Sequence, residues 1–276
     1  MPPPPSSLPP LPVVASSAAL ITAAAPFFAS TRSLALTLPL APTPPDECEG
    51  WSIATVYGEL VPHSVASLLA LALDGCTSAP AHGALFVDLG SGEGVPCLVA
   101  RTLFTARIAR ARGVELLPRV HRVAVRLREA TRLTVREYAV AEDAAEWALC
   151  AADAWKLAEP GAEGGIELLC DDFLDGSAAA TSWPEADVVF FNGTCYDVPT
   201  LERVWRAAER MRPGSIIIVT THEMPGRLFE LMHEGVVAAS WGEASVRVYR
   251  RLPLPKWVAG IVGRSGRGGR SSPQPN

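Results

Sequence analysis

The sequence lacks paired cysteines and any cluster of residues spaced to bind a metal. Its six cysteines, at positions 48, 76, 97, 150, 170 and 195, never occur as C-x-x-C. No group of His and Cys residues has the spacing that structural zinc sites require. We therefore expect a reduced intracellular protein without a bound metal.

The first 45 residues lack acidic side chains and contain a single charge, Arg32. They hold about half of the 25 prolines, together with many Ala, Ser and Thr residues. Because this composition is typical of unfolded segments, we expect residues 1–45 to be low-complexity, either disordered or a leader. Residues 13–31 are apolar like a targeting peptide but have no basic start, so organellar targeting stays open and a membrane span is not expected.

Acidic and basic residues are distributed unevenly along the chain. Residues 46–252 carry 29 acidic and 19 basic side chains, a net charge of −10. Residues 253–276 have the opposite balance, with three arginines, one lysine and no acid. We expect one folded domain over 46–252 and a flexible Arg/Gly-rich tail over 253–276. Such a tail can contact nucleic acid weakly or can act only as a solubilising terminus.

Apolar runs alternate with helical patterns through the whole of the expected domain. Five apolar runs predict strands, at residues 84–87, 111–115, 166–170, 187–191 and 215–221. Helical patterns lie before and between them, at residues 61–73, 95–110, 118–157 and 199–211. We expect the long pattern at 118–157 to divide into two helices. This alternation predicts an α/β fold with a doubly wound parallel sheet, closed by an antiparallel hairpin at 240–251.

The run ALFVDLGSGEG at residues 84–94 is the most informative motif. Its three glycines, Gly90, Gly92 and Gly94, follow an apolar strand that ends at Asp88. Glycine allows bare backbone to approach a ligand before the next helix begins. The spacing G-x-G-x-G differs from the G-x-G-x-x-G of dinucleotide sites and is typical of methyltransferases. The motif therefore predicts S-adenosyl-L-methionine (SAM) as the cofactor.

Polar residues stand at the ends of the first four strands, where parallel pairing would bring them into one cleft. Asp88 can hold the loop amides and the amino-acid end of SAM, and Glu115 can accept both ribose hydroxyls. Asp172 offers an acceptor to the adenine amino group, and Phe173 offers an aromatic face. Asn192 ends the fourth strand near the departing methyl group. A single carboxylate there is more often a helix cap, and Phe173 alone is more often core, so only the whole set favours SAM.

Several segments resemble the non-SET histone lysine methyltransferases of the Dot-one (disruptor of telomeric silencing) family. They are VYGEL at 56–60, FVDLGSGEG at 86–94, GVE at 113–115, DDFL at 171–174, VVFFN at 188–192 and SWGEASVRVY at 240–249. The resemblance implies a Rossmann-like, seven-stranded class I SAM-dependent methyltransferase fold, with a mostly parallel sheet and a closing antiparallel hairpin.

The same resemblance implies which residues form the site. SAM would contact Tyr57, Gly58, Glu59, Leu60, Asp88, Gly90, Ser91, Gly92, Gly94, Glu115, Asp172 and Phe173. Asn192 would line the channel between the methyl group and the acceptor lysine, and Tyr196 is a second candidate catalytic residue as a wall of that channel. The chain departs from the family on this substrate side, where the family's second asparagine and two phenylalanines are replaced by Gly193, Thr194 and Tyr196.

Three functions remain compatible with these residues. The resemblance implies a nuclear enzyme that methylates a lysine of histone H3, at position seventy-nine in the family, by direct displacement from SAM. The altered channel residues favour instead a class I methyltransferase that acts on a non-histone protein or a small molecule. The third possibility is a SAM-binding module without turnover. Protein substrate, possible nucleic-acid contact through the tail and no membrane are the expected partners.

Overall fold

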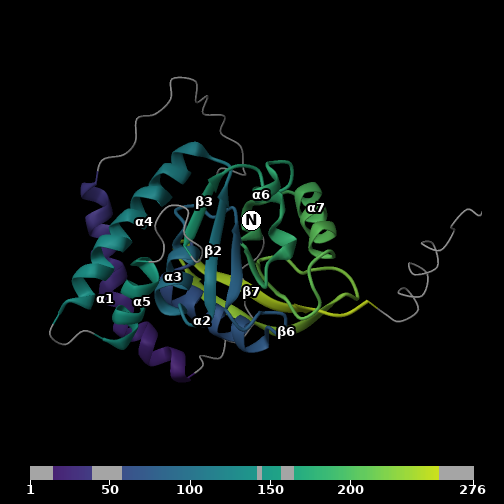
Figure 1. Cartoon of the computed structure of the whole chain (residues 1–276). Coiled ribbons are helices and arrows are strands. Elements are labelled where there is room, and N and C mark those ends of the chain that lie inside the picture. The colour runs from purple at the N-terminus through teal and green to yellow at the C-terminus, as the bar shows by residue number, and fades with distance from the viewer. Residues whose placement is uncertain (1–14, 39–57, 142–144, 157–164, 255–276) are drawn as a thin grey trace, which may run out of the picture.

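The computed structural model describes residues 15–38, 58–141, 145–156 and 165–254. Within these ranges seven strands form one sheet in the order β3-β2-β1-β4-β5-β7-β6 (Figure 1). The first five strands run parallel, whereas β7 runs antiparallel to both of its neighbours, β5 and β6. The predicted fold class is confirmed, because this order and the closing hairpin are those of class I SAM-dependent methyltransferases.

Helices cover both faces of this sheet. The strands are β1 (Ala84–Leu89), β2 (Ile108–Glu115), β3 (Ile166–Cys170), β4 (Val188–Phe191), β5 (Ile216–Thr220), β6 (Phe229–Ala239) and β7 (Gly242–Arg251). The helices are α1 (Ala15–Thr37), α2 (Pro62–Gly75), α3 (Val95–Leu103), α4 (Pro118–Ala139), α5 (Glu146–Lys156), α6 (Ala178–Thr181) and α7 (Val198–Ala208). Helices α1 to α5 pack on one face and α6 and α7 on the other. The pattern at 118–157 thus divides into two helices, as expected.

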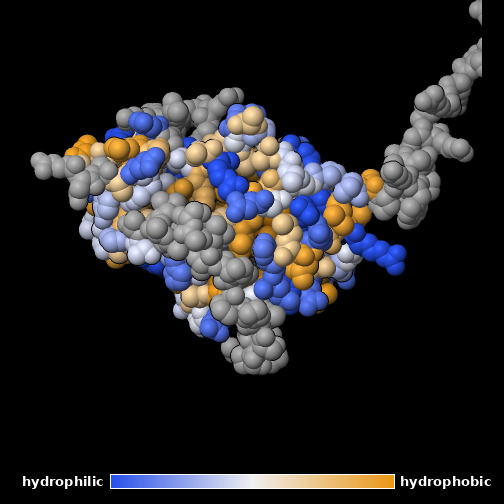
Figure 2. All heavy atoms as spheres, turned by 90° about the horizontal axis from the view of Figure 1, so that it is seen from below, coloured by the Kyte–Doolittle hydropathy of each residue, from blue (hydrophilic) through white to orange (hydrophobic). Residues whose placement is uncertain are grey.

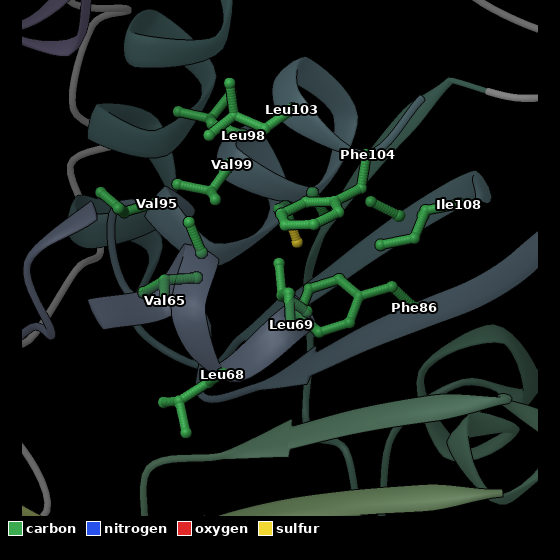
Figure 3. Close-up of a cluster of buried hydrophobic side chains, with 14 of the residues drawn as sticks. Val65, Leu68, Leu69, Phe86, Val95, Leu98, Val99, Leu103, Phe104 and Ile108 are labelled. Atoms are coloured by element: carbon green, nitrogen blue, oxygen red, sulfur yellow. The ribbon is translucent and has the colours of Figure 1, made fainter. Parts of the chain in front are cut away.

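The central strands are apolar throughout because both of their faces are covered. Every residue of β4 and β5 is buried. Successive side chains of β1 point to opposite faces of the sheet. Phe86 packs in the hydrophobic core with α2 and α3, and Val87 packs in the core on the side of α7. In Figure 3 the side chains of α2 and α3 lie over Phe86 and Ile108. This packing holds the carboxyl ends of β1, β2 and β4 together.

Helix α1 corrects the expectation that residues 1–45 do not pack. Residues 15–37 form a helix against α2 and α4, in which Phe27 is fully buried. The Phe27 ring lies 5.6 Å from the ring of Tyr138 and 5.3 Å from that of Trp147, centre to centre. The buried residues, Ala24, Phe27, Thr31 and Ala35, recur every three or four positions, so the helix packs along one apolar stripe while its other side is exposed. No helix among the described residues is long and apolar enough to cross a membrane.

Strand β6 is the element that the sequence analysis missed. Its sequence, FELMHEGVVAA, lacks regular alternation, because it is an edge strand with few fully buried residues. Eleven residues nevertheless form a strand, because β7 supplies hydrogen-bonding partners along its length. The predicted hairpin at 240–251 consists only of the turn and β7.

The helix expected at 95–110 is shorter than predicted: it ends at Leu103, and β2 begins at Ile108. On the face seen in Figure 2, hydrophobic residues lie in small groups among hydrophilic ones.

Candidate cofactor-binding site

A glycine loop connects β1 to α3. Gly90, Gly92 and Gly94 have φ angles of 69°, 56° and 79°, in the left-handed region that side chains other than glycine rarely adopt. The backbone N–H groups of Gly90 and Ser91 donate to the carbonyl oxygen of Val114 at 2.9 and 3.0 Å. The loop is therefore fastened to the end of β2, as a preformed turn rather than a flexible one.

Glu115 ends β2 and reaches into this loop. Its Oε2 accepts from the backbone N–H of Gly92 at 2.9 Å, and its Oε1 accepts from that of Leu117 at 2.8 Å. The residue is 8% exposed, and burial raises the pKa of its carboxyl. Each carboxylate oxygen can accept more than one hydrogen bond. Both oxygens thus retain capacity for a pair of neighbouring hydroxyls, as the expected ribose contact requires.

Asp88 lies buried at the end of β1, beside Glu115. Its side chain is 1% exposed, and its Oδ2 has no hydrogen-bond partner among the described residues. Burial, followed by the charges of Glu115 and Glu59, raises its pKa well above the usual value. A buried acceptor without a partner destabilises a fold by about 1–3 kcal/mol. A cationic ligand would remove this penalty, so the group fits the amino-acid end of SAM.

Residues 58–60 fold over the loop from a distant part of the chain. The carbonyl oxygen of Gly58 accepts from Nδ2 of Asn192 at 3.0 Å, and Leu60 pairs with Ala239 of β6. Oε1 of Glu59 accepts from the backbone N–H of Glu93 at 3.3 Å. Glu59 therefore contacts the glycine loop, while Gly58 and Leu60 are bonded to Asn192 and Ala239 beside it. Their contact with SAM stays a prediction. Tyr57, the fourth predicted residue of this segment, lies outside the described residues.

Glu59 gives the site a testable pH dependence. Burial, followed by the charge of Glu93, raises its pKa to about 8. Between pH 4.5 and 8 the unfolded chain is ionised at this carboxyl while the folded chain holds the proton, so folding stability falls as the pH rises. Replacing Glu59 with Gln should raise the free energy of unfolding at pH 8 by at least about 1 kcal/mol. Urea denaturation at pH 4 and pH 8 measures this, and an equal effect at both pH values contradicts it.

Asp172 and Phe173 follow β3 and line the same edge. Oδ1 of Asp172 accepts from the backbone N–H groups of Leu174 and Asp175 at 2.7 and 3.1 Å, so this oxygen shapes the turn. Phe173 is 7% exposed, and its ring lies 6.1 Å from that of Phe191. Both residues reach the site, but each also has the structural role that its type most often has.

Asn192 is placed at the site but is engaged on both ends of its amide. Besides the bond to Gly58, its Oδ1 accepts from the hydroxyls of Thr194 at 2.9 Å and Thr220 at 2.6 Å. It therefore joins β4, β5 and residues 58–60. The role in which this oxygen orients an acceptor amine stays a prediction. It would require one of these hydroxyls to give up its hydrogen bond to Oδ1.

Tyr196 packs against the glycine loop, and its predicted role as a wall of the substrate channel stays a prediction. Its ring packs 5.0 Å from Phe191 and 5.9 Å from Phe173, centre to centre. A Cβ built on Gly90 would lie 2.3 Å from the tyrosine hydroxyl. The side chain therefore contacts the glycine loop itself.

A turn after β5 was missed by the sequence analysis. Thr221 has a φ of 66°, and the backbone N–H of His222 donates to the carbonyl oxygen of Thr220 at 2.7 Å. These features define a tight, strained turn of a kind that is uncommon outside functional sites. A sequence signal for this turn was available, because polar residues follow the apolar run at 215–221 just as they follow the other strands.

Among the described residues, no group of three or more His, Cys, Asp or Glu could hold a metal ion.

Comparison with known proteins gives similarity of fold alone. No family model and no curated protein matches the chain. Among solved structures, the rRNA methyltransferase aviRa from Streptomyces viridochromogenes is 14% identical with a TM-score of 0.49, covering 74% of this chain and 94% of that one. TrmN from Thermus thermophilus is 20% identical with a TM-score of 0.47, covering 72% and 52%. The magnesium protoporphyrin IX methyltransferase of Synechocystis, solved with bound SAH, is 12% identical with a TM-score of 0.43, covering 69% and 82%.

These findings correct the resemblance to the Dot-one family, which is wrong. The similar solved structures are methyltransferases of other kinds, and no histone methyltransferase model matches the chain. Most of the short motifs that carried the resemblance were expected to contact the cofactor, so they did not identify the acceptor. The histone substrate falls with the resemblance, and nuclear localisation, which only the resemblance implied, has no other support. The chain has the class I SAM-dependent methyltransferase fold, with a site whose residues fit SAM.

Proposed function

We propose that the protein is a SAM-dependent methyltransferase that acts on a non-histone protein or a small molecule. The observation that carries this proposal is the bond between Glu115 and Gly92, at the carboxyl ends of two adjacent parallel strands. It places a buried carboxylate beside three left-handed glycines, in a sheet of the methyltransferase order. A ligand with two hydroxyls and a cationic end fits that arrangement.

The mechanism requires the protein mainly to position the reactants and exclude water. When bound, SAM supplies a methyl group on a sulfonium, which transfers by direct displacement. Glu115 would hold the ribose hydroxyls, and Asp88 would receive the cationic amino-acid end and ionise as it does so. Glu59, brought over the loop by residues 58–60, adds a third carboxyl. SAM and its product share the ribose and the amino-acid end, so Glu115 and Asp88 would contribute to the affinity for both.

The acceptor would approach the edge formed by residues 192–196. Asn192 and the hydroxyls of Thr194 and Thr220 form a bonded network there, so the segment presents a defined polar edge. The tail at 253–276, of which residues 255–276 lie outside the described part of the chain, remains a candidate for weak contact with an anionic acceptor.

The test has two stages on the purified full-length protein. Calorimetry should detect SAM binding, and radiolabelled SAM should transfer label to a component of cell extract. Digesting the labelled extract with protease or nuclease, or filtering it by size, then assigns the acceptor to protein, nucleic acid or small molecule. Absence of SAM binding contradicts the proposal. Binding without transfer to any fraction means that the protein is a SAM-binding module without turnover.

A further inference from the structure

Tyr196 covers the face of the glycine loop that a cofactor would approach. The Cβ position of Gly90 lies 2.3 Å from the tyrosine hydroxyl and 3.5 Å from Cζ of the ring. The end of the Tyr196 side chain thus takes the space that the missing side chain of Gly90 leaves open. Glycine at this position is used here to admit a residue of the protein itself.

The surroundings of the Tyr196 hydroxyl are those of the candidate cofactor site. Burial raises its pKa, and the charges of Glu115, Asp88 and Asp172 raise it further. These are the three carboxyls that would hold the ribose, the amino-acid end and the adenine of SAM. The Tyr196 ring also lies edge-on to Phe173, the aromatic residue expected beside adenine, at an interplanar angle of 68°. Four neighbours of Tyr196, namely Asp88, Glu115, Asp172 and Phe173, are therefore groups that SAM would need.

We propose that Tyr196 occupies part of the SAM cradle in the free protein and must rotate away before SAM can bind. This inference rests on the proposed function, since it assigns a regulatory residue to the same site. The protein with Tyr196 in place cannot bind SAM, so the apparent affinity is the intrinsic affinity reduced by the fraction of molecules that are open. Tyr196 thus weakens and delays cofactor binding.

The backbone on both sides indicates that the movement is a side-chain rotation. The N–H of Tyr196 donates to the carbonyl oxygen of Gly193 at 3.1 Å, within the turn η3 (Gly193–Cys195). Gly193 is closely packed, because a Cβ there would lie 3.2 Å from both His222 and Thr220. Asp197 caps α7 by accepting from the N–H of Thr200 at 3.0 Å. Because the backbone on both sides of Tyr196 is held by these contacts, we expect the movement to be a rotation of the Tyr196 side chain.

Calorimetry and stopped-flow binding of SAM to three variants test the proposal. Tyr196→Ala removes the obstruction and should bind SAM at least tenfold more tightly, with faster association. Tyr196→Phe removes the hydroxyl nearest to Gly90 but keeps the ring in the cradle, so its affinity should lie between those of the wild type and Tyr196→Ala. Tyr138→Phe, on α4, is a matched control and should bind like the wild type. Weaker or unchanged SAM binding by Tyr196→Ala overturns the proposal, since the tyrosine would then contact the cofactor or lie outside its path.

A second measurement follows the hydroxyl directly and needs no catalysis. With only four tyrosines in the chain, carbon-13 labelling of tyrosine and comparison with Tyr196→Phe identify the Tyr196 signal. Saturation with S-adenosylhomocysteine should move this signal and lower its pKa toward that of an exposed tyrosine, and an unmoved signal overturns the proposal. If Tyr196→Ala binds SAM and the wild type shows no measurable binding, the result supports the proposal that Tyr196 blocks the site. If neither the wild type nor any variant binds SAM, the proposed function is wrong, and the proposed role of Tyr196 is wrong with it.

Discussion

Replacing Asp187 with Ala is expected to lower the free energy of unfolding by about 3–5 kcal/mol. The Asp187 side chain is 2% exposed and pairs with Nη2 of Arg212 at 2.7 Å. It also accepts from the hydroxyl of Ser78 at 3.0 Å and from the backbone N–H of Leu85 at 2.9 Å. One carboxylate therefore ties the start of β4 to β1, to the segment after α2 and to the segment before β5. Its loss removes the acceptor of two half-buried donors and of Arg212.

Urea denaturation of Asp187→Ala and a matched variant measures this effect. Asp175 pairs with Arg203 at 2.5 Å, but the two side chains are 64% and 45% exposed. Exposed ion pairs contribute little, so Asp175→Ala should lower the free energy of unfolding by less than about 1 kcal/mol. Similar losses in the two variants would show that burial of the Asp187 network is not what stabilises the sheet.

Replacing Glu115 with Ala should weaken SAM binding by at least about 100-fold, which corresponds to about 2.7 kcal/mol. The variant loses the expected ribose contact and also the bond that holds the N–H of Gly92. Glu115→Gln should be weakened as well. Both oxygens of Glu115 accept from backbone N–H groups, and an amide can present only one oxygen, so its NH₂ group would face a donor.

Calorimetry with SAM measures the affinity of both Glu115 variants. Glu167→Ala is the matched control, since Glu167 lies on the adjacent strand β3 and its side chain is 48% exposed in a pair with Arg112. The control should bind SAM with wild-type affinity. Circular dichroism must show that each variant is folded. Wild-type affinity of folded Glu115→Ala for SAM would show that Glu115 does not contact the cofactor.

Local patterns along the chain were sufficient to predict the cofactor edge. The glycine spacing required a loop with left-handed backbone, which Gly90, Gly92 and Gly94 provide. Glu115 was expected at the end of a strand paired with β1, and the parallel register of β1 and β2 brings it there. These predictions succeed because the carboxyl ends of parallel strands must meet at one edge of a sheet.

Other features could not be read from local patterns. Residues 15–37 carry one charge, Arg32, and this composition is compatible with disorder or with a packed helix. Only the surfaces of α2 and α4 decide that the helix packs. Strand β6 carries little pattern of its own and depends on pairing with β7. The resemblance to a histone methyltransferase family failed for a related reason, because motifs that bind a shared cofactor carry no information about the acceptor.

The sequence by itself determined an α/β fold with a doubly wound parallel sheet and a candidate cofactor edge centred on Asp88, the three glycines and Glu115. Both follow from periodicity and spacing within short segments. Only the tertiary structure decided that Asn192 is bonded to Gly58, 134 residues away, and that Tyr196 lies against Gly90. The physical reason is that hydrogen bonds and steric contacts between distant segments depend on how the whole sheet closes. The residues that share the glycine loop with the cofactor are therefore a property of the fold, and not of the motif.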